Sequence, residues 1–354
     1  MPIPVVWSAR CREHVPAAEI WLGIPTPGTE VPERVDVVVD ALRAAGHRLL
    51  EAAEHDDEVL SLVHDNALLE HLSTVHATWA ASGTAAESGQ EHVVPYVFPT
   101  DAMLGGIPAS EAAAVHGRAG AFCYDTMTLV GPGTWTAARA AVDCALTAVD
   151  VVLEGERAAY AVCRPPGHHA TSEAYGGSCY LNNAAVAAQA LRATGHERVA
   201  VVDVDAHHGN GTSAIFYDRA DVFYGSVHVD PGAGWFPHFV GHASERGSGD
   251  GLGANLNVPL APRAGDAEFL SAVATISDEV RGHSASAVVV SLGVDASADD
   301  PESPFLVSLD GYRRAGERLA ALGLPSVIVQ EGGYHLPSLG GLVAAFVSAY
   351  SSDG

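Results

Sequence analysis

The sequence predicts an α/β domain built on a parallel sheet that is covered by helices. Short apolar runs rich in β-branched residues recur along the chain, and each is followed by a cluster of polar residues. Runs without polar alternation are typical of strands buried on both faces of a sheet. Stretches with helical patterning separate them, as in βαβ units. Because 48% of the 354 residues are apolar and only 17% are charged, we expect one domain with a large buried core.

Strands and helices are predicted in alternation. The strands are expected at Ala158–Cys163, Arg198–Val204, Val222–Val227, Ala287–Leu292 and Ser326–Val329. The helices are expected at Pro32–Ala45, Asp57–Trp79, Thr134–Glu154, Asn182–Thr194, Asp266–Arg281, Leu309–Leu322 and Leu339–Tyr350. Ligands of such sheets bind beyond the carboxyl ends of the strands, and the polar clusters of this chain follow its strands.

Two connecting segments are long, about residues 82–121 and about residues 230–257. Long ordered segments of a compact domain are usually functional, and disorder is the alternative explanation. The second segment is rich in glycine, but it lacks the strand, glycine turn and helix of a phosphate-binding motif. We therefore expect its glycines to allow tight turns.

The chain is strongly acidic. Its formal net charge of −25 comes from 43 acidic and 18 basic residues, and every basic residue is an arginine. A field of this sign repels nucleic acids and anionic membranes and attracts cationic solutes such as polyamines. Solubility alone explains the charge equally well. We expect a small cationic partner, and neither a nucleic acid nor a membrane.

The predicted location is the cytoplasm. The cysteines show no spacing typical of a metal site or of a disulfide framework. The start of the sequence lacks a basic region followed by a long apolar run, and no later stretch is long and apolar enough to cross a bilayer.

The densest polar cluster follows the predicted strand 198–204. It contains Asp203, Asp205, His207, His208 and Asn210. Residues two apart on an extended strand point to the same side, so Asp203, Asp205 and His207 are expected to share one face. Carboxylate and imidazole groups are metal ligands, whereas a polar network that closes the end of the sheet is the alternative.

A third ligand is expected from another strand, because a catalytic zinc ion keeps three protein ligands and one open position. Asp295 follows the predicted strand 287–292 in the same way as the first cluster follows its strand. Asp299 and Asp300 are rivals, but they lie farther into a loop, where we expect them to be solvated.

Two further clusters follow predicted strands. His168 and His169 come after Arg164-Pro-Pro-Gly, and imidazoles suit proton transfer near neutral pH, although such a pair alone is often a surface feature. Tyr334 ends Glu331-Gly-Gly-Tyr, where the glycines allow backbone angles that bring the phenol into a cleft. A phenol near a metal ion can donate a hydrogen bond to a developing oxyanion, whereas a packed aromatic in a turn is the alternative.

Taken in order, these motifs resemble the histone deacetylase superfamily. They are Arg164-Pro-Pro-Gly-His-His-Ala, Gly177-Ser-Cys-Tyr-Leu-Asn-Asn, Asp203-Val-Asp-Ala-His-His-Gly-Asn-Gly-Thr, Leu292-Gly-Val-Asp and Glu331-Gly-Gly-Tyr. The stretch Tyr96-Val-Phe-Pro-Thr and the segment after it look closest to the bacterial acetylpolyamine amidohydrolases. The resemblance implies one arginase–deacetylase domain over residues 1–354, with a parallel sheet of about eight strands.

The resemblance also assigns roles. It makes Asp205, His207 and Asp295 the ligands of one zinc ion, although iron or cobalt suits the same ligands. It places His168 and His169 beside the attacking water. It makes Tyr334 the group that polarises the substrate carbonyl and holds the oxyanion.

Partners of the two histidines follow from the same resemblance. Asp203 matches the residue that orients the first histidine, and Asn210 stands where some family members carry an aspartate partner of the second. With this neutral partner, His169 is expected to be the less readily protonated of the two and the general base. The resemblance further implies a potassium ion, bound partly by main-chain oxygens around Asp203, Asp205 and His207 and by the hydroxyl of Ser226.

The substrate channel departs from the family pattern. Ser178, beside Gly177, stands where many family members carry a phenylalanine of the channel wall, whereas Trp235 and Phe236 match the opposite wall. Tyr175 is expected either to compensate for the missing ring or to belong to the core.

Two features at the rim concern the size and charge of the substrate. Glu302 falls near a position where a polyamine-selective relative carries a glutamate, so it would attract a secondary ammonium group unless it is merely solvated. The segment that resembles residues 82–121 commonly narrows the channel and builds a homodimer in the family.

The predicted function is therefore zinc-dependent hydrolysis of an N-acetyl amide on a small cationic amine. A ureohydrolase of the arginase type shares the fold but needs a second-metal ligand where this chain has Gly209. The same motifs are also compatible with a protein acetyl-lysine deacetylase, a tailoring deacetylase of a biosynthetic pathway or a non-catalytic acyl-ligand sensor.

Overall fold

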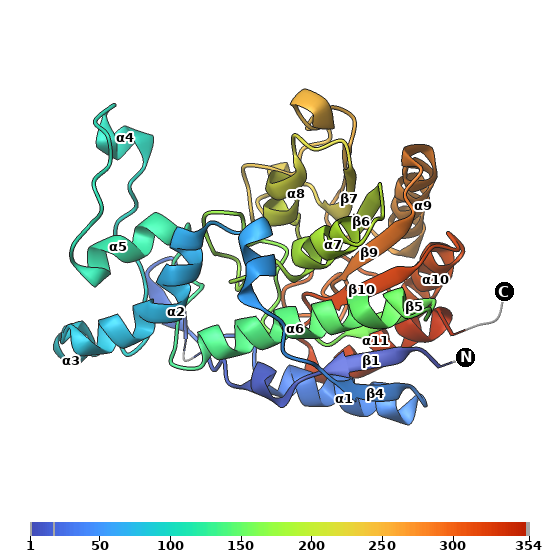
Figure 1. Ribbon diagram of the computed structural model, residues 1–354, viewed down its shortest axis with the longest axis horizontal. Coiled ribbons are helices and arrows are strands. Elements are labelled where there is room, and N and C mark those ends of the chain that lie inside the picture. The colour runs from blue at the N-terminus through green and yellow to red at the C-terminus, as the bar shows by residue number, and fades with distance from the viewer. Residues whose placement is uncertain (1, 17, 352–354) are drawn as a thin grey trace.

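Eight strands form one parallel sheet at the centre of the computed structural model, which describes residues 2–16 and 18–351 (Figure 1). Their order across the sheet is β4-β1-β5-β10-β9-β6-β7-β8. The strands are β1 Pro4–Trp7, β4 Arg48–Glu51, β5 Ala158–Ala161, β6 Val199–Asp203, β7 Val222–Val229, β8 Asn255–Leu260, β9 Ala287–Leu292 and β10 Ser326–Gln330. The predicted α/β class with a parallel sheet is confirmed.

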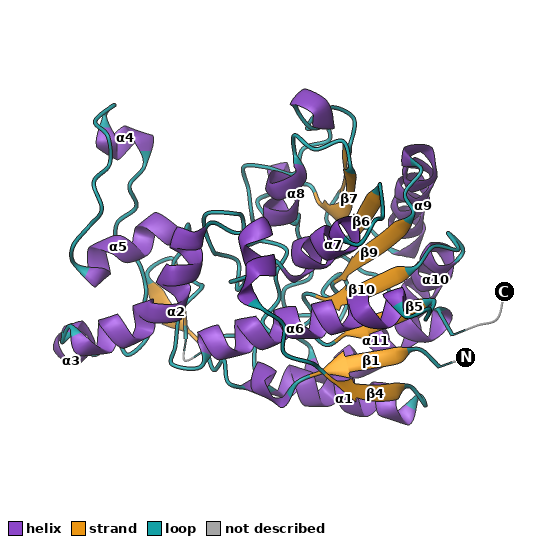
Figure 2. Ribbon diagram, in the orientation of Figure 1, coloured by secondary structure: helices purple, strands orange, loops and turns teal. Residues whose placement is uncertain are grey.

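Helices cover both faces of this sheet (Figure 2). Helices α6, α7 and α8 lie on one face, and α1, α9, α10 and α11 pack against one another on the other. The helices are α1 Glu33–Ala44, α2 Asn66–Ala81, α3 Thr84–Ser88, α4 Asp101–Leu104, α5 Val115–Phe122, α6 Thr134–Leu153, α7 Asn183–Ala193, α8 Asn210–Phe216, α9 Asp266–His283, α10 Leu309–Ala320 and α11 Leu336–Ala349. None of the helices in the described part of the chain is both long and apolar enough to cross a membrane.

Central and edge strands differ in how clearly the sequence marks them. Every residue of β5, β6, β7, β9 and β10 is buried, and all five strands were predicted from their apolar runs. The edge strand β4 has exposed residues at both ends, β1 is only four residues long, and β8 begins inside the predicted glycine-rich loop. These three strands and a small antiparallel hairpin, β2 Glu19–Trp21 with β3 Ile24–Thr26, were not predicted.

The helix predicted over residues 57–79 is wrong as one element. A 3-10 helix, Asp57–Leu62, precedes α2, and the chain between them is extended at Asp65. The N–H of Asp65 donates to the carbonyl of Ser172 (2.8 Å). Nδ1 of His64 donates to the carbonyl of Thr171 (2.9 Å), and Nε2 of His64 accepts from the N–H of Asn182 (2.9 Å). These tertiary hydrogen bonds interrupt the helical pattern. The last helix begins at Leu336, three residues before its predicted start at Leu339.

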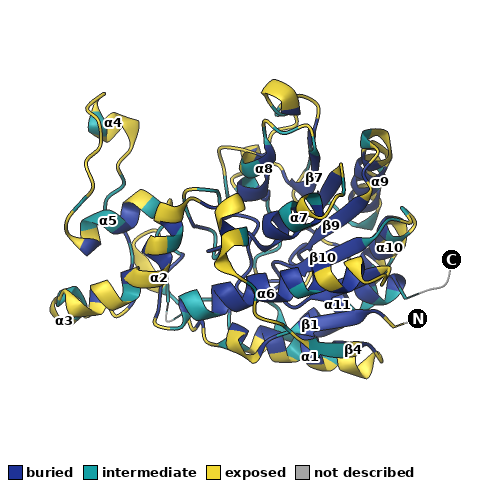
Figure 3. Cartoon of the chain, viewed as in Figure 1, coloured by how far each residue is buried: buried dark blue, intermediate teal, exposed yellow. Residues whose placement is uncertain are grey.

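Residues 82–121, expected as one long loop, form an arm that contains α3, α4 and α5. The tip of this arm, α4, lies far from the sheet (Figure 1). Most residues of the arm are exposed (Figure 3). Apolar side chains are among them, because Met103 is 62% and Ile107 is 72% exposed. Residues 230–257 contain the 3-10 helices Pro231–Ala233 and Gly249–Gly251 before β8 begins.

Two neighbouring glycines of α11 allow a matched test of helix packing. A Cβ at Gly340 would lie 2.7 Å from Cβ of Ala41 and 2.8 Å from the carbonyl oxygen of Val37 on α1, whereas at Gly341 the nearest atom would be 3.9 Å away. We expect Gly340→Ala to lower the free energy of unfolding by about 1–3 kcal/mol, because α11 has to move away from α1. Gly341→Ala should leave it unchanged or raise it by up to about 1 kcal/mol through helix propensity. Urea unfolding measures both, and equal effects would contradict the close contact.

Candidate metal and catalytic site

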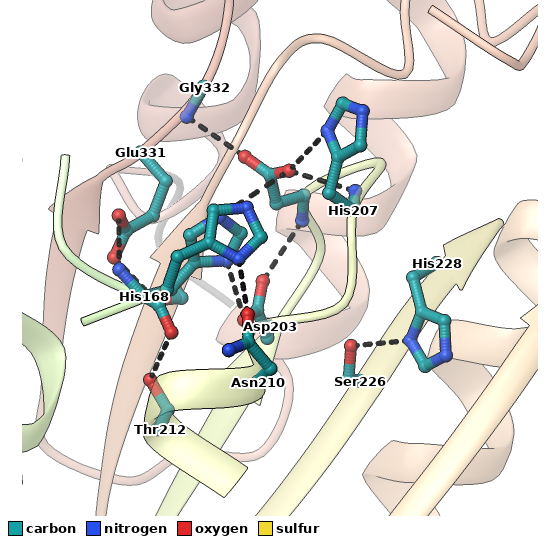
Figure 4. A network of polar contacts seen from close by, with 12 residues as sticks. His168, Asp203, His207, Asn210, Thr212, Ser226, His228, Glu331 and Gly332 are labelled. Carbon is teal, nitrogen blue, oxygen red and sulfur yellow. Dashed lines mark hydrogen bonds and ion pairs between the residues drawn. The ribbon is translucent and has the colours of Figure 1, made fainter. Parts of the chain in front are cut away.

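The candidate site lies beyond the carboxyl ends of β5, β10, β9 and β6, which are successive neighbours in the sheet. A polar segment follows each of these strands, and parallel strands end at the same edge. The segments contain His168, Glu331, Asp295 and Asp205, respectively. Clusters far apart in the sequence therefore meet in one place (Figure 4).

Asp205, His207 and Asp295 each bring a possible ligand atom to a common point. These atoms all lie within 4.8 Å of one another. Nδ1 of His207 lies 2.9 Å from Oδ2 of Asp295 and 3.4 Å from Oδ1 of Asp205. Both carboxylates are almost fully buried. Two carboxylates and one imidazole form a donor set that suits zinc and related divalent metals.

Asp203, Asp205 and His207 do not share one face of a strand, so that expectation is wrong. β6 ends at Asp203, and the other two residues lie in the turn beyond it. In this turn Oδ1 of Asp203 accepts from the N–H of Asp205 (3.2 Å), and Oδ1 of Asp205 accepts from the N–H of His207 (2.9 Å). The turn directs Asp205 toward His207, while Asp203 contacts His168 (Figure 4).

Backbone donors hold the two carboxylates of the candidate metal site. The N–H of Gly332 donates to Oδ2 of Asp205 (2.9 Å), and the N–H of Ala206 donates to Oδ1 of Asp295 (2.9 Å). A Cβ on Gly332 would lie 2.6 Å from Oδ2 of Asp205, so only glycine allows this approach. Within the described residues, only histidines form ion pairs with these carboxylates. The buried negative charge therefore suits a cation.

Burial and neighbouring charges separate the two carboxylates. Burial opposes ionisation of Asp205, but the charges of His168 and His207 outweigh it and lower the pKa of Asp205. Burial and the charge of Asp205 raise the pKa of Asp295 to about 7. A cation bound between them would favour the charged form of both groups.

His168 and His169 lie side by side, with ring centroids 4.0 Å apart. Nδ1 of His168 donates to Oδ2 of Asp203 (3.1 Å), and Nδ1 of His169 donates to Oδ1 of Asn210 (2.7 Å). Burial opposes the charge of His168, but the carboxylates of Asp205 and Asp203 outweigh it and raise its pKa to about 10. Burial and the charge of His168 lower the pKa of His169 well below its usual value. His169 is thus the less readily protonated ring.

Asp203 also contacts the neighbouring strand β7. Its Oδ2 accepts from the hydroxyl of Tyr224 (3.0 Å), a partner that the sequence did not indicate. Ser226 is the register partner of Asp203 in the sheet, and its hydroxyl lies 2.7 Å from Nδ1 of His228 (Figure 4). Asp203 and Ser226, two of the predicted potassium ligands, are therefore neighbours, and the potassium ion stays a prediction.

A cavity of about 460 Å³ opens onto these groups. The predicted reactive and substrate-binding residues that line it are His169, His207, Tyr334, Gly177, Ser178, Trp235, Phe236 and Glu302. Tyr175 does not line it. That ring is fully buried and stacks with Tyr180, so Tyr175 belongs to the core.

Tyr334 is held by two charged residues. The guanidinium of Arg34 lies 4.9 Å from its ring centroid, and Oδ2 of Asp300 accepts from its N–H (2.6 Å). Burial, followed by the charge of Glu302, raises the pKa of Tyr334 well above its usual value, so the phenol keeps its proton and can donate it to a hydrogen bond. The expectation that Asp300 is solvated is wrong, because Asp300 is buried and accepts from the N–H groups of both Tyr334 and His335, whereas Asp299 is exposed as expected.

Glu302 faces the cavity and is not a solvated acid of the loop. Its carboxylate accepts a hydrogen bond from the hydroxyl of Thr29, and burial raises its pKa. Glu19 lines the same cavity, and burial together with the charge of Glu302 raises the pKa of Glu19 to about 7. Above that pH Glu19 adds a negative charge to the cavity.

Sequence reasoning missed several residues that line or support the cavity. Glu19 and Trp21 reach it from the unpredicted hairpin β2–β3, and Met127 reaches it from a loop. A period of two within the short β2 was the available signal, because it places Glu19 and Trp21 on one side of the strand.

Glu331 braces the loop of the two histidines, a role that the sequence did not indicate. Its Oε2 accepts from the N–H groups of Gly167 (2.7 Å) and His168 (3.1 Å), and its Oε1 accepts from the hydroxyl of Ser291 (2.8 Å). Burial raises the pKa of this fully enclosed carboxyl group to about 7.

The chain belongs to the histone deacetylase family, because residues 28–350 match the histone deacetylase domain. It is therefore a hydrolase of the deacetylase class, as the sequence predicts. The acetylpolyamine amidohydrolase of Burkholderia pseudomallei (strain 1710b) is 43% identical over 324 residues, which cover 91% of either chain. The acetylpolyamine amidohydrolase of Mycoplana ramosa is 38% identical over 337 residues, or 95% of this chain and 96% of that relative.

Solved structures agree with this assignment. The crystal structure of acetylpolyamine aminohydrolase from Burkholderia pseudomallei has a TM-score of 0.93 at 40% identity, over 99% of both chains. The crystal structure of the HDA15 HD domain has a TM-score of 0.79 at 26% identity, over 99% of this chain and 90% of that one. These comparisons confirm the predicted resemblance to the histone deacetylase superfamily and to its acetylpolyamine amidohydrolase branch.

Glu331→Gln tests how much ionisation of the buried Glu331 carboxyl group lowers the free energy of unfolding. Glutamine can keep the contacts, because its amide oxygen accepts from Gly167 and His168 while its NH₂ group donates to Ser291. The folded pKa of about 7 lies above the usual 4.5, so ionisation opposes folding and wild-type stability should fall as the pH rises through this window. The variant should gain up to about 1.4 kcal/mol of unfolding free energy per pH unit relative to wild type. Urea titrations across the window measure this, and a constant difference would contradict the raised pKa.

Proposed function

We propose that this chain hydrolyses the acetamide of a small acetylated cationic amine, such as an acetylpolyamine, and releases acetate. One observation carries the proposal. A single cavity is lined by His169, His207 and Tyr334 and also by the carboxyl groups of Glu19 and Glu302. His169, His207 and Tyr334 are side chains that can take part in amide hydrolysis. The carboxyl groups of Glu19 and Glu302 suit a cationic substrate. The similarity to acetylpolyamine amidohydrolases at 38–43% identity supports the same conclusion.

Asp205, His207 and Asp295 would hold one zinc ion in this proposal. Their convergence and the buried negative charge that they share support this assignment. When bound there, zinc supplies Lewis acidity that polarises the substrate carbonyl and lowers the pKa of water.

The protonation states of the two histidines define their proposed roles. Asn210 holds the Nδ1–H of His169, which leaves Nε2 to take a proton from the attacking water. His168 keeps its proton because Asp203 and Asp205 favour its charged form. Tyr334 donates its O–H to the oxyanion that forms when water adds to the carbonyl. The proton that His169 took from water then passes to the amide nitrogen. Collapse of this tetrahedral intermediate breaks the C–N bond and yields the free amine and acetic acid, which ionises to acetate.

Glu302 and Glu19 would bind the free ammonium group of the substrate. Both line the cavity, and the net charge of −25 adds a long-range attraction for cations. Gly177 and Ser178 form a wall without bulky side chains, and Trp235 and Phe236 also line the cavity. A slim, extended amine suits this space.

We also propose a homodimer that is built through residues 82–121, together with a potassium ion near Asp203 and Ser226 and a cytoplasmic location. The exposed apolar side chains of the arm support the dimer, because an apolar surface of this kind favours a protein partner. Leu22 (81% exposed) and Phe239 (88% exposed) are similar apolar side chains, and they line a neighbouring cavity that shares Trp21 and Phe236 with the first.

Zinc binding tests the proposed ligand set. Asp295→Asn should weaken zinc binding by more than about 100-fold, because loss of a direct ligand costs more than loss of an outer-shell partner. Asp299→Asn, four residues away and exposed, is the matched control and should bind like wild type. Equilibrium dialysis with elemental analysis gives the zinc content per chain. Stoichiometric zinc in Asp295→Asn would remove this residue from the site.

Deacetylation kinetics on acetylputrescine, N8-acetylspermidine and an acetyl-lysine peptide test the proposed substrate class. We expect wild type to prefer the polyamines. Glu302→Gln and Glu19→Gln should raise KM for the polyamines and leave KM for the peptide unchanged, because each removes one negative charge without changing shape. Tyr334→Phe should lower kcat on every substrate by about 10²–10³-fold.

The pH dependence sharpens this test. Glu19 is charged only above its raised pKa of about 7, so its contribution to polyamine binding should fade as the pH falls below 7. The difference in KM between wild type and Glu19→Gln should shrink in the same range. A preference for the peptide, or indifference to both glutamates, would move the chain to the protein or metabolite deacetylases.

A further inference from the structure

Asp125 joins two segments of the cavity wall and has no role in the mechanism above. Its Oδ1 accepts from the N–H groups of Met127 (2.9 Å) and Thr128 (2.9 Å). Its Oδ2 accepts from the hydroxyl of Thr128 (3.1 Å) and from the N–H of Gly177 (2.6 Å). Met127 and Gly177 both line the cavity. One carboxylate, with four donors, therefore connects two pieces of the wall that are about fifty residues apart.

The second piece is a tight turn with an unfavourable backbone. Gly176 and Cys179 exchange two backbone hydrogen bonds (3.1 and 3.0 Å), and the two residues between them have positive φ angles, +57° at Gly177 and +60° at Ser178. Glycine adopts such angles readily, whereas serine does so at a cost. The N–H of Ser178 donates to the hydroxyl of Thr128 (2.9 Å). Asp125 and Thr128 thus hold this turn through hydrogen bonds from the first piece of the cavity wall.

The turn packs directly against the proposed general base. A Cβ on Gly177 would lie 2.5 Å from Cδ2 of His169 and 2.9 Å from Cε1 of Phe236, so the backbone of Gly177 touches both rings. A shift of the turn therefore changes both the position of the His169 ring and the width of the cavity beside it.

The segment around Asp125 is tied to the rest of the site as well. The hydroxyl of Tyr124 donates to the carbonyl of His169 (2.9 Å). Thr126 exchanges hydrogen bonds with Ile20 of β2, through its carbonyl (3.2 Å) and its hydroxyl (2.7 Å). The segment is thus a rigid support from which Asp125 can act on the turn.

We propose that Asp125 is a positioning residue, which acts through Thr128 and the turn at Gly177 and Ser178 to fix the His169 ring and to keep the cavity narrow. Slim acetylated amines are thereby favoured over acetylated peptide side chains. Its carboxylate is occupied by four donors and does not serve as a binding site for the substrate ammonium. The inference rests on the proposed function for its effect on selectivity, but the clamp on the turn is independent of it.

Three variants separate the clamp from the charge. Thr128→Val is nearly isosteric and removes the hydroxyl that links Asp125 to Ser178 without changing any charge. Thr128→Ser keeps the hydroxyl and is the matched control. Asp125→Asn removes the charge and leaves an amide that cannot accept from all four donors.

The first readout is backbone amide hydrogen exchange of residues 176–179 in the full-length protein. We expect exchange about tenfold faster in Thr128→Val and Asp125→Asn, and exchange like wild type in Thr128→Ser, because a hydrogen bond to the turn is lost only in the first two. Unchanged exchange in both would overturn the clamp, whether or not the protein hydrolyses any acetamide.

The second readout is the ratio of kcat/KM for acetylputrescine to kcat/KM for an acetyl-lysine peptide. Thr128→Val and Asp125→Asn should lower kcat on both substrates, because the His169 ring is displaced. They should also lower the ratio about tenfold, because a wider cavity positions the slim acetylputrescine less well, whereas Thr128→Ser should keep the wild-type ratio. If Asp125→Asn alone raised KM for acetylputrescine, Asp125 would bind the ammonium group of the substrate directly and the positioning role would be wrong. Absence of hydrolysis by wild type would instead refute the proposed function and leave the exchange result to decide the clamp.

Discussion

Buried negative charge at the ends of the central strands is the constraint on which the rest of the site depends. Asp205 and Asp295 are almost inaccessible, and their partners among the described residues are histidine rings and backbone N–H groups. Charge buried in this way destabilises the fold unless donors or a cation compensate for it. The close approach of Gly332 and the turn after β6 are local solutions to that problem.

The same charge sets the difference between the two adjacent histidines. His168 lies near two carboxylates and is favoured as a cation, and its charge in turn disfavours protonation of His169. The neutral side chain of Asn210 holds His169 without adding a charge. A pair of identical residues thus acquires different proton affinities from its surroundings alone, which is the arrangement that acid–base chemistry requires.

The sequence by itself determined the class of fold and most of the reactive groups. Strands in the middle of a covered parallel sheet must be apolar throughout, so β5, β6, β7, β9 and β10 are visible as uninterrupted runs. The polar residues directly after them are contiguous with the strands, so Asp205, His207 and Asp295 were identified together with their strands. Parallel packing then brings these segments to one edge of the sheet without further information.

Only the tertiary structure decided what reaches the site from elsewhere in the chain. Residues 171, 172 and 182 break the helix expected over 57–79, the backbone of Tyr334 holds Asp300 in a buried position, and Glu19 enters the cavity from a hairpin that was not predicted. Asp125 meets Gly177 only because two loops close on each other. Periodicity records which face of an element is buried, but it carries no information about which distant segment will cover that face, because such contacts depend on how the whole chain closes.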